Sequence, residues 1–352
     1  MSVATRIAGI GTYVPERKID NDHVLGLLRD HSAPYLTDEE FSALMDKAGK
    51  NLEKAGNVTR YWCREDEYCT DIAREASLKA MEDAGVEPAD IELIIFTGMS
   101  KAFVEPATAN VLQGELGAEG ANVIDTQDAC SSFIKSMQIA DCFIKTGLYR
   151  TVLVACGERT FDWGDFQCKS VEELKWKFGA LTIGDAAGAM VLQATEDPLY
   201  TEAEHHMECS FRTKGKSFAA CNIGLNYRVG ERYKLQSHSN KLFSTVLELG
   251  AQLFSETEWR FLDFKNVFTH DIGRLMQDYE LPLFLKLIEA AGRPVPEFYY
   301  RPTFSEYGNV ASASLPLGMR LVLDEGKLER GSRAVFFGGA AGVQAFGATF
   351  IY

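Results

Sequence analysis

The sequence predicts an α/β protein in which one α/β unit occurs twice. Short apolar runs alternate with helical stretches along the 352 residues, and the second half of the chain repeats the order of the first. Alternation of this kind is typical of layered α/β folds. With 46% apolar and 24% charged residues, the chain is long enough to bury one large core or two medium ones.

Two apolar runs are the clearest predicted strands. Residues 91–97 (IELIIFT) and 151–155 (TVLVA) are nearly continuous in apolar side chains, as strands buried on both faces usually are. Helical segments are predicted over 71–84 and 131–146, and a glycine follows each of them directly. Glycine at that position favours the left-handed helix cap, so both helix ends are predicted as well.

The C-terminal half repeats this plan. Cys130 to Gly147 and Asn309 to Gly326 both span 17 positions, and each stretch leads into an apolar run, TVLVAC or RAVFFGG. The run IELIIFTGMS likewise matches FKNVFTHDIG. Self-similarity at a fixed spacing indicates duplicated α/β units, although strand patterns common to α/β proteins can also match by chance.

Composition excludes several classes of protein. The 36 basic and 50 acidic residues give a net charge of −14, which repels a phosphate backbone and argues against nucleic-acid binding. No run approaches the ~18 apolar residues of a membrane span, and the start MSVATRIAGIG lacks a secretory signal. We therefore expect a cytoplasmic protein. The eight cysteines form no CxxC pair, which predicts reduced thiols and no metal.

Cys130 is the candidate nucleophile. It lies in DTQDACSSFIKSMQIADCF, where the first turn of a largely apolar helix is predicted. The positive end of the helix dipole and its free amides favour the thiolate over the thiol. The alternative is a small core residue, which is what most free cysteines are.

His270 is the candidate base or hydrogen-bond donor. Of the six histidines, only His270 directly follows an apolar strand-like run, NVFTH, whereas the others lie in polar, surface-like contexts. The end of a strand is where α/β proteins assemble their sites. A structural histidine is the alternative.

Asn309 is the third candidate. It lies in YGNVASASLPLGMRL, at the start of the repeated helix, and simple helix capping is the alternative role. Cys130, His270 and Asn309 together supply a nucleophile, a base or donor, and a neutral amide. Papain-like proteases use the same order, but their cysteine has a different context in a secreted chain, so we exclude a protease.

Six motifs follow one another along nearly the whole chain. They are IGTYVPE (10–16), AREASLKAMEDAGVEPADIELIIFTG (73–98), Asp128-Ala129-Cys130, IGDAAGA (183–189), Tyr307-Gly308-Asn309 and GGAAGVQAFGA (338–348). The sequence thereby resembles the thiolase superfamily, and within it the β-ketoacyl-ACP synthase III (FabH-like) branch. The resemblance implies a thiolase fold in five layers, α-β-α-β-α. It also implies an N-terminal half (1–195) with the nucleophile and a C-terminal half (196–352) with the histidine and asparagine.

The resemblance also implies roles for the candidate residues. Cys130 would take an acyl group from CoA or an acyl carrier protein as a thioester. His270 and Asn309 would polarise the carbonyl of a second thioester and stabilise its enolate. The backbone N–H groups of Cys130 and of Ala341 or Gly342 would form the oxyanion hole. No cofactor is implied, and a homodimer is expected.

Two positions set this chain apart within the family. The family usually has Gln after the histidine, whereas this chain has Asp271, which argues against a housekeeping fatty-acid role. Glu105 in FVEPATANVLQGELG resembles the glutamate of head-to-head olefin synthases and of pyrone- or resorcinol-forming ketosynthases. In that branch the glutamate reaches into the partner's site, where a carboxylate can act as general base. The alternative for Glu105 is a favourable charge at the start of the next helix.

A basic region is the candidate docking surface for the carrier protein or for the phosphates of CoA. Between positions 212 and 241 the only acidic residue is Glu231, against the seven basic residues Arg212, Lys214, Lys216, Arg228, Arg232, Lys234 and Lys241. We assign docking to Arg212, Lys214, Lys216 and Arg274. A solvated loop region with a chance charge bias is the alternative.

The leading hypothesis is a dimeric ketosynthase that forms a carbon–carbon bond by Claisen condensation. It would join an acyl group on Cys130 to a second acyl or β-ketoacyl thioester in polyketide or fatty-acid-derived specialised metabolism. Three alternatives stay open: decarboxylative extension with malonyl-ACP, acyl transfer to an alcohol or amine, and a non-catalytic partner subunit of the same fold.

Overall fold

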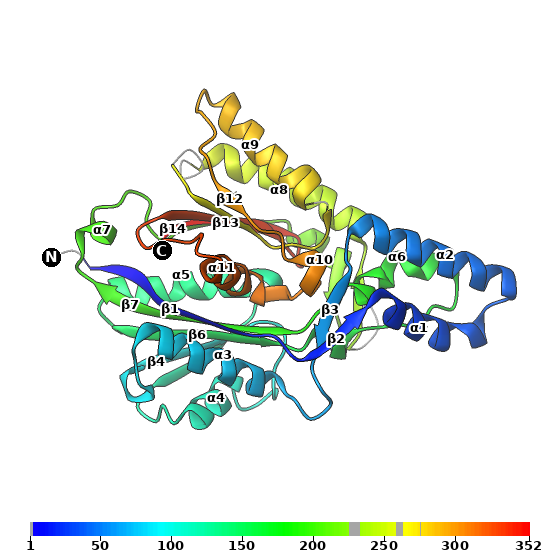
Figure 1. The fold of residues 1–352 in the computed structure, drawn as a ribbon, viewed down its shortest axis with the longest axis horizontal. Helices are drawn as coiled ribbons and strands as arrows, with labels where there is room; N and C mark the ends of the chain where they lie inside the picture. The colour runs from blue at the N-terminus through cyan, green and yellow to red at the C-terminus, as the bar shows by residue number, and fades with distance from the viewer. Residues whose placement is uncertain (1–2, 225–232, 258–262, 275) are drawn as a thin grey trace.

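The computed structural model describes residues 3–224, 233–257, 263–274 and 276–352. Two five-stranded sheets lie one above the other, with helices between them and on both outer faces (Figure 1). The protein therefore has the five layers α-β-α-β-α that the sequence predicts. No helix in the described part of the chain combines the length and hydropathy needed to cross a bilayer.

The two sheets have the same strand order and strand directions. The first sheet is ordered β1-β7-β6-β4-β5 and the second, read from its β8 edge, β8-β14-β13-β11-β12. In each sheet the first three strands pair antiparallel and the last three parallel. The strands of the first sheet are β1 (Ala4–Tyr13), β7 (Ala186–Thr195), β6 (Thr151–Glu158), β4 (Leu93–Thr97) and β5 (Asn122–Thr126). Those of the second are β8 (Glu208–Thr213), β14 (Gln344–Ile351), β13 (Arg333–Ala340), β11 (Asn266–Thr269) and β12 (Tyr299–Tyr300).

The predicted duplication is therefore confirmed. The run at 91–97 contains β4 and the run at 151–155 forms the first part of β6, and their counterparts in the second half are β11 and β13. The glycines after the two predicted helices have the expected left-handed conformation, with φ of +67° at Gly85 and +75° at Gly147.

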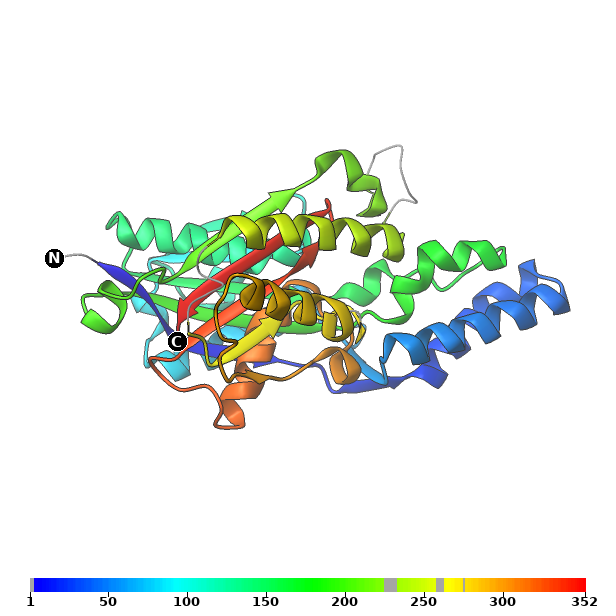
Figure 2. The same ribbon diagram turned by 90° about the horizontal axis from the view of Figure 1, so that it is seen from above.

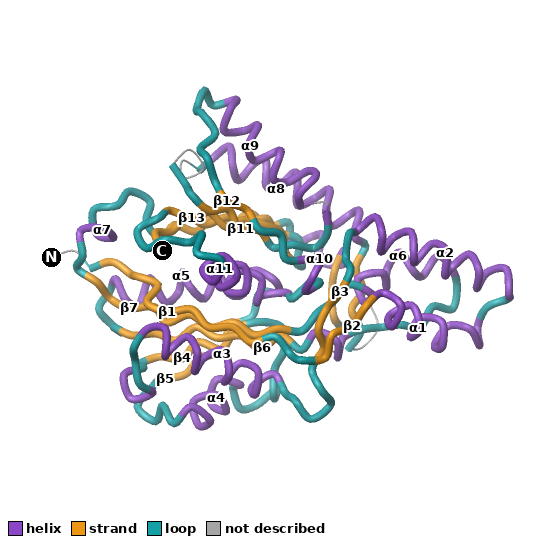
Figure 3. Tube along the Cα trace, in the orientation of Figure 1, coloured by secondary structure: helices purple, strands orange, loops and turns teal. Residues whose placement is uncertain are grey.

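Helices fill the central layer and cover both outer faces (Figures 1 and 3). The central helices, which contact strands of both sheets, are α5 (Ser132–Lys145) and α11 (Ser314–Asp324). The outer pairs are α3 (Cys69–Ala84) with α4 (Thr108–Leu116), and α8 (Ser239–Glu256) with α9 (Leu281–Ala290). Close approach of α3 to β1 requires Gly11, because a Cβ there would lie 2.0 Å from the carbonyl oxygen of Ala76.

The remaining elements lie at the periphery. A two-stranded antiparallel sheet of β2 (Arg17–Asp20) and β3 (Thr59–Trp62) lies at the base of an extension that projects beyond the large sheets (Figure 2). The helices of this extension are α1 (Asn21–Ser32), α2 (Asp38–Ala55) and α6 (Leu174–Lys177). Further short elements in the described residues are α7 (Pro198–Thr201), α10 (Phe304–Tyr307), β9 (Cys221–Ile223) and β10 (Leu235–Ser237).

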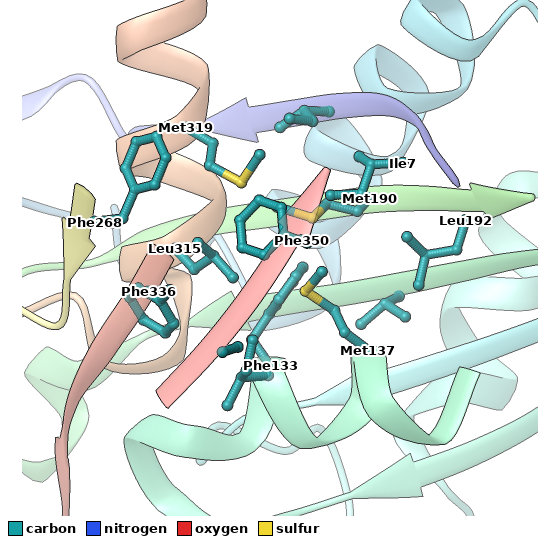
Figure 4. Packing of buried hydrophobic residues seen from close by; sticks show 14 of the residues in the cluster. Ile7, Phe133, Met137, Met190, Leu192, Phe268, Leu315, Met319, Phe336 and Phe350 are labelled. Carbon is teal, nitrogen blue, oxygen red and sulfur yellow. The ribbon is translucent and has the colours of Figure 1, made fainter. Parts of the chain in front are cut away.

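The largest core cluster lies in the central layer (Figure 4). It contains buried side chains from both sheets and from α5 and α11, and each such side chain contributes about 1.5–3 kcal/mol through burial. Members labelled in Figure 4 are Ile7, Phe133, Met137, Met190, Leu192, Phe268, Leu315, Met319, Phe336 and Phe350. This cluster holds the starts of α5 and α11 rigidly between the sheets.

Each central helix begins with a sharp backbone turn, which we call an elbow. The first elbow is the 3-10 turn η3 (Ala129–Ser131) before α5, and the second is η10 (Ala311–Ala313) before α11. In each case the first residue is an alanine with left-handed φ, +49° at Ala129 and +48° at Ala311. Cys130 therefore corresponds to Ser312. The sequence paired Cys130 with Asn309, and this register is wrong because α11 has 11 residues whereas α5 has 14.

Candidate active site

The first elbow presents Cys130 at the start of α5. The hydroxyl of Ser132 donates to the carbonyl of Ala129 over 2.6 Å and accepts from the backbone N–H of Asp128 over 2.7 Å. These bonds stabilise the left-handed conformation of Ala129, which an L-residue rarely adopts. The elbow lies against both η10 and β13, so Cys130 faces elements of the C-terminal half.

Burial opposes ionisation of Cys130. It is the largest cause that raises the pKa of this thiol, and the neighbouring Cys221 and Glu158 raise it further. The backbone N–H groups of Ala341 and of Cys130 itself act in the opposite direction. The expected resting thiolate is therefore wrong, because desolvation outweighs the helix dipole. The thiol needs a base to react.

His270 follows β11 and is 1% exposed. Its ring fits because position 338 is glycine: a Cβ at Gly338 would lie 2.8 Å from the Cβ of His270. The backbone N–H of His270 donates to the carbonyl of Phe337 over 3.1 Å. Burial lowers the pKa of His270 to about 4, so the imidazole is neutral at physiological pH and can accept a proton.

Ser314 sets the tautomer of His270. Its hydroxyl lies 2.8 Å from Nδ1 of His270 and 2.8 Å from the carbonyl oxygen of Ala311. A hydroxyl has one proton to donate. When Ser314 donates to Ala311, Nδ1 of His270 holds the hydrogen and Nε2 has a free lone pair. When Ser314 donates to Nδ1, Nε2 holds the hydrogen instead.

Asn309 precedes the second elbow. Its backbone N–H donates to the carbonyl of Thr182 over 2.8 Å, and its carbonyl accepts from Gly184 over 3.0 Å. Its side-chain Oδ1 accepts the backbone N–H of Ala311 over 3.0 Å. Because Oδ1 has this local partner, the amide Nδ2 remains as the donor. The side chain closes a local turn and does not cap α11.

The predicted oxyanion-hole segment is the turn between β13 and β14. Two of its residues have left-handed φ, Gly342 at +80° and Val343 at +53°. The next residue, Gln344, donates from Nε2 to Oδ2 of Asp128 over 2.9 Å, and Lys135 pairs with the same carboxylate. The turn and the first elbow are therefore fastened together at Asp128.

Several supporting residues were not found from the sequence. Asp128, Gln344, Ser314 and Glu158 all connect segments that are distant along the chain. The only sequence signal for Glu158 is an acidic residue at the end of an otherwise apolar run, in VACGERT. It is 0% exposed and accepts hydrogen bonds from both halves of the protein.

Glu105 lies in an exposed loop. Within this loop Phe103 is 56% exposed and Val104 is fully exposed. Among the described residues of the same chain, none hydrogen-bonds to the carboxylate of Glu105. The residue is free to contact another molecule.

The carboxylate of Asp271, the residue after His270, is bonded to residues 300 and 303 of the same chain. Its carboxylate is buried and accepts from the hydroxyl of Tyr300 over 3.0 Å and from the backbone N–H of Thr303 over 2.6 Å. Burial raises the pKa of this carboxyl group. Asp271 thus fastens the end of β11 to the segment before α10.

The basic region has less free charge than its sequence indicates. Arg212 pairs with Glu256, and Lys214 pairs with Glu248 over 3.2 Å, both acids coming from α8. Lys216 is exposed, and Arg274, also exposed, packs over Gly56. Three residues of the region, Arg228, Glu231 and Arg232, lie outside the described residues.

Family models match two segments of the chain. The model described as 3-oxoacyl-[acyl-carrier-protein (ACP)] synthase III matches residues 124–215, and the model of its C-terminal part matches residues 281–352. These segments contain the first elbow and the second elbow with the β13–β14 turn.

Curated relatives match over nearly the full length. The β-ketoacyl-[acyl-carrier-protein] synthase III of Xanthomonas campestris pv. campestris is 28% identical over 345 residues, which cover 96% of this chain and 95% of the relative. The enzyme of the same name from Clostridioides difficile is 27% identical over 352 residues and 97% of each chain.

Solved structures match in fold. A variant of Xanthomonas campestris OleA with bound lauric acid and lauroyl-CoA has a TM-score of 0.79 at 22% identity, over 100% of this chain and 99% of that one. The 3-oxoacyl-[acyl-carrier-protein] synthase III of Aquifex aeolicus has a TM-score of 0.74 at 21% identity, over 99% of this chain and 100% of that one.

Proposed function

We propose that the chain is a member of the 3-oxoacyl-ACP synthase III family, whose two models match residues 124–215 and 281–352, and that it joins two acyl thioesters by Claisen condensation through a covalent acyl group on Cys130. One observation carries the proposal: the first elbow holds a thiol against the N–H of Ala341, while a neutral histidine is held beside the second elbow. A nucleophile, an oxyanion donor and a base are the parts that acyl transfer needs.

The first half-reaction is thioester exchange. Nε2 of His270 accepts the proton of the Cys130 thiol as the sulfur attacks the carbonyl carbon of an acyl thioester. The N–H groups of Cys130 and Ala341 stabilise the oxyanion, with Gly342 shaping the turn that directs them. The carbon–sulfur bond of the donor then breaks, and the proton passes from His270 to the departing thiolate.

The second half-reaction forms the carbon–carbon bond. A base removes the α-proton of a second thioester, and His270 Nε2–H and Asn309 Nδ2–H stabilise the enolate oxygen. The hydroxyl of Ser314, bonded to Nδ1, gives His270 the tautomer that this step requires. The enolate carbon attacks the acyl carbonyl, Cys130 leaves, and its thiolate takes up the proton. The product is a β-ketoacyl thioester.

We assign the base to Glu105 of a partner subunit. Support comes from its exposed loop and from the apolar side chains of Phe103 and Val104 beside it, which a second copy would bury. Strand β5 lies at an edge of its sheet, and an open edge is a surface for pairing with another strand. A homodimer would therefore bring two loops and two sites together.

Docking is assigned to the exposed cations. Lys216 and Arg274 are the stronger candidates for an acidic carrier protein or the phosphates of CoA. Arg212 and Lys214 would have to break their ion pairs with the glutamates of α8 before they could bind the ligand.

The deciding experiment is intact mass spectrometry followed by product analysis. The protein is incubated with acyl-CoA donors of graded chain length, lauroyl-CoA among them, and the adduct is mapped to a peptide. We expect an acyl adduct on the Cys130 peptide and a β-ketoacyl product once a second thioester is added. Absence of any adduct with every donor would identify a silent subunit. Release of carbon dioxide from malonyl-ACP would identify decarboxylative extension, and an ester or amide product would identify acyl transfer alone.

The role of Glu105 is tested by complementation. Glu105→Gln should acylate normally and fail to couple non-malonyl thioesters. Co-expression of Glu105→Gln with Cys130→Ala should restore about a quarter of the coupling activity, because half of randomly paired dimers are mixed and one of their two sites is intact. Unchanged coupling by Glu105→Gln alone returns the residue to a role at the start of the next helix.

A further inference from the structure

Glu158 is a fully buried carboxylate without a cation. It ends β6 and is 0% exposed. Among the described residues, no lysine, arginine or histidine forms an ion pair with it. Burying a charge or a carboxyl group costs free energy unless hydrogen bonds compensate it. The hydrogen bonds that Glu158 accepts must therefore offset the cost of burying its side chain.

Within the described parts of the chain, all hydrogen-bond donors to Glu158 belong to two loops. The backbone N–H groups of Met99 and Ser100 each donate to Glu158 over 3.2 Å. On the other side, the backbone N–H of Ser312 donates over 3.3 Å, and the Ser312 hydroxyl donates as well. One side chain thus joins the loop after β4 to the second elbow.

Each of these loops leads to residues of the proposed condensation step. The loop after β4 continues to Glu105. The second elbow lies between Asn309, whose Oδ1 it holds through Ala311, and Ser314, which contacts His270. The first elbow with Cys130 has its own support in Asp128, which Glu158 does not contact.

The glycine beneath this junction shows how tightly it is packed. Gly98 has φ of +115°. A Cβ at this position would lie 2.6 Å from Oε1 of Glu158 and 2.9 Å from the hydroxyl of Ser312. The hydrogen bond between Glu158 and Ser312 therefore lies directly against Gly98 and leaves no room for a side chain there.

We propose that Glu158 is a positioning residue for carbon–carbon bond formation: it holds the loop of Glu105 and the elbow between Asn309 and Ser314 in fixed register. This inference rests on the proposed function. Glu158 does not contact substrate, because it is fully buried and both of its oxygens are occupied by protein donors. Its effect therefore falls mainly on the second half-reaction, which uses Glu105 and Asn309 in addition to His270.

The test compares the two half-reactions in Glu158→Gln. The amide directs N–H groups at backbone N–H donors and so shifts both loops. Because a displacement of about 1 Å can cost on the order of 100-fold in rate, we expect condensation to fall by ~100-fold. Acylation of Cys130, measured by intact mass, should fall by a clearly smaller factor, since this step uses neither Glu105 nor Asn309 and the Cys130 elbow is also held through Asp128.

Ser312→Ala provides a second variant if Glu158→Gln folds poorly. It removes only the hydroxyl donor and keeps the backbone N–H. We therefore expect condensation to fall more than acylation again, but by a smaller factor, ~10-fold. The matched control is Glu67→Gln. Glu67 is also buried, at 4% exposure, and accepts from the hydroxyl of Tyr13 over 2.6 Å and from the N–H of Arg64 over 3.1 Å. Loss of the Glu67 carboxylate should lower the melting temperature, while the rates of acylation and condensation stay in the same ratio as in the wild type.

The outcomes distinguish this inference from the proposed function. If the wild-type protein neither acylates nor condenses, the proposed function fails. If the wild-type protein does both, and Glu158→Gln and Ser312→Ala lose the two half-reactions equally or lose neither, only the positioning role is overturned. A split in Glu67→Gln of the same size also overturns it, because general loosening would then suffice.

Discussion

The two elbows have nearly the same backbone and different neighbours. In each, an alanine has φ close to +50° and the serine three residues later bonds back to its carbonyl, over 2.6 Å at Ala129 and 2.8 Å at Ala311. The residue after the alanine is Cys130 in one and Ser312 in the other. The opposite half supplies the backbone N–H of Ala341 to Cys130, and the carboxylate of Glu158 to Ser312.

Under the proposed function, this difference explains how a duplicated fold would have one reactive centre. An N–H group beside the thiol stabilises negative charge as it develops on a substrate oxygen. A buried carboxylate beside the hydroxyl instead takes up its only donor and immobilises it. One elbow is therefore suited to bond formation, and the other to holding Asn309 and Ser314 in place.

The largest expected effect comes from giving the first elbow the side chain of the second. Cys130→Ser should lower acylation by at least ~1000-fold, because a hydroxyl is far less ionised and less nucleophilic than a thiol. Intact mass after exposure to acyl-CoA measures the adduct, and Cys130→Ala gives the baseline. An adduct that persists in both variants would place the nucleophile on another residue.

A smaller effect is expected from the groups around the second elbow. Asn309→Ala should reduce condensation by about 100- to 1000-fold, the cost of losing one oxyanion donor, while the acyl adduct forms as in the wild type. His270→Ala should reduce condensation by a similar factor, and because it also removes the base that accepts the thiol proton, it should leave acylation only partly intact. The control is His206→Asn, a buried histidine whose Nδ1 accepts from the N–H of Ile351 over 3.1 Å. It should affect stability only. Equal loss of both half-reactions in all site variants contradicts the division between the elbows.

The pH dependence of Cys130 alkylation tests the environment of the first elbow. Burial raises the pKa of this thiol above its ordinary value, so at pH 7 the reactive thiolate is a smaller fraction than the few per cent of an unperturbed thiol. Alkylation by iodoacetamide should therefore increase ~10-fold per pH unit from pH 7 to 9 without levelling off. A plateau below pH 8 in mapped Cys130 peptides indicates an activated thiolate instead.

The smallest effect is expected when a thiol is placed in the second elbow. Ser312→Cys in a Cys130→Ala background should give no acyl adduct on the peptide containing residue 312, because Glu158 occupies the position from which a donor would act. Peptide mapping after incubation with acyl-CoA provides the measurement. A mapped adduct at 312 means that the backbone turn alone creates reactivity.

The sequence was sufficient for the architecture, whereas the roles of Cys130, His270 and Asn309 stay predictions. Apolar runs at β4 and β6, the glycine caps and the repeat predicted the duplicated layers. The repeat register was wrong because equal spacing to Gly147 and Gly326 concealed that α11 is one turn shorter than α5. The predicted thiolate was wrong because burial of Cys130 depends on residues far away in the chain.

The supporting contacts could not be predicted from the sequence, because they also join residues that are far apart in the chain. Glu158 bonds to a residue 154 positions away and Gln344 to one 216 positions away, so no local pattern links them. His206 was expected at the surface, yet it is 9% exposed and bonds to the N–H of Ile351. Polar neighbours in sequence do not report which chain segments later cover a side chain.

The absent side chain at Gly98 limits how this protein can be re-engineered. Any larger residue there collides with Glu158 and Ser312 at once, so the three positions behave as one interlocked unit. Scanning them individually would return only damaged variants, whereas a library that randomises all three together could reach alternative packings. Changing the coupling chemistry of this protein therefore requires that Gly98, Glu158 and Ser312 are substituted together.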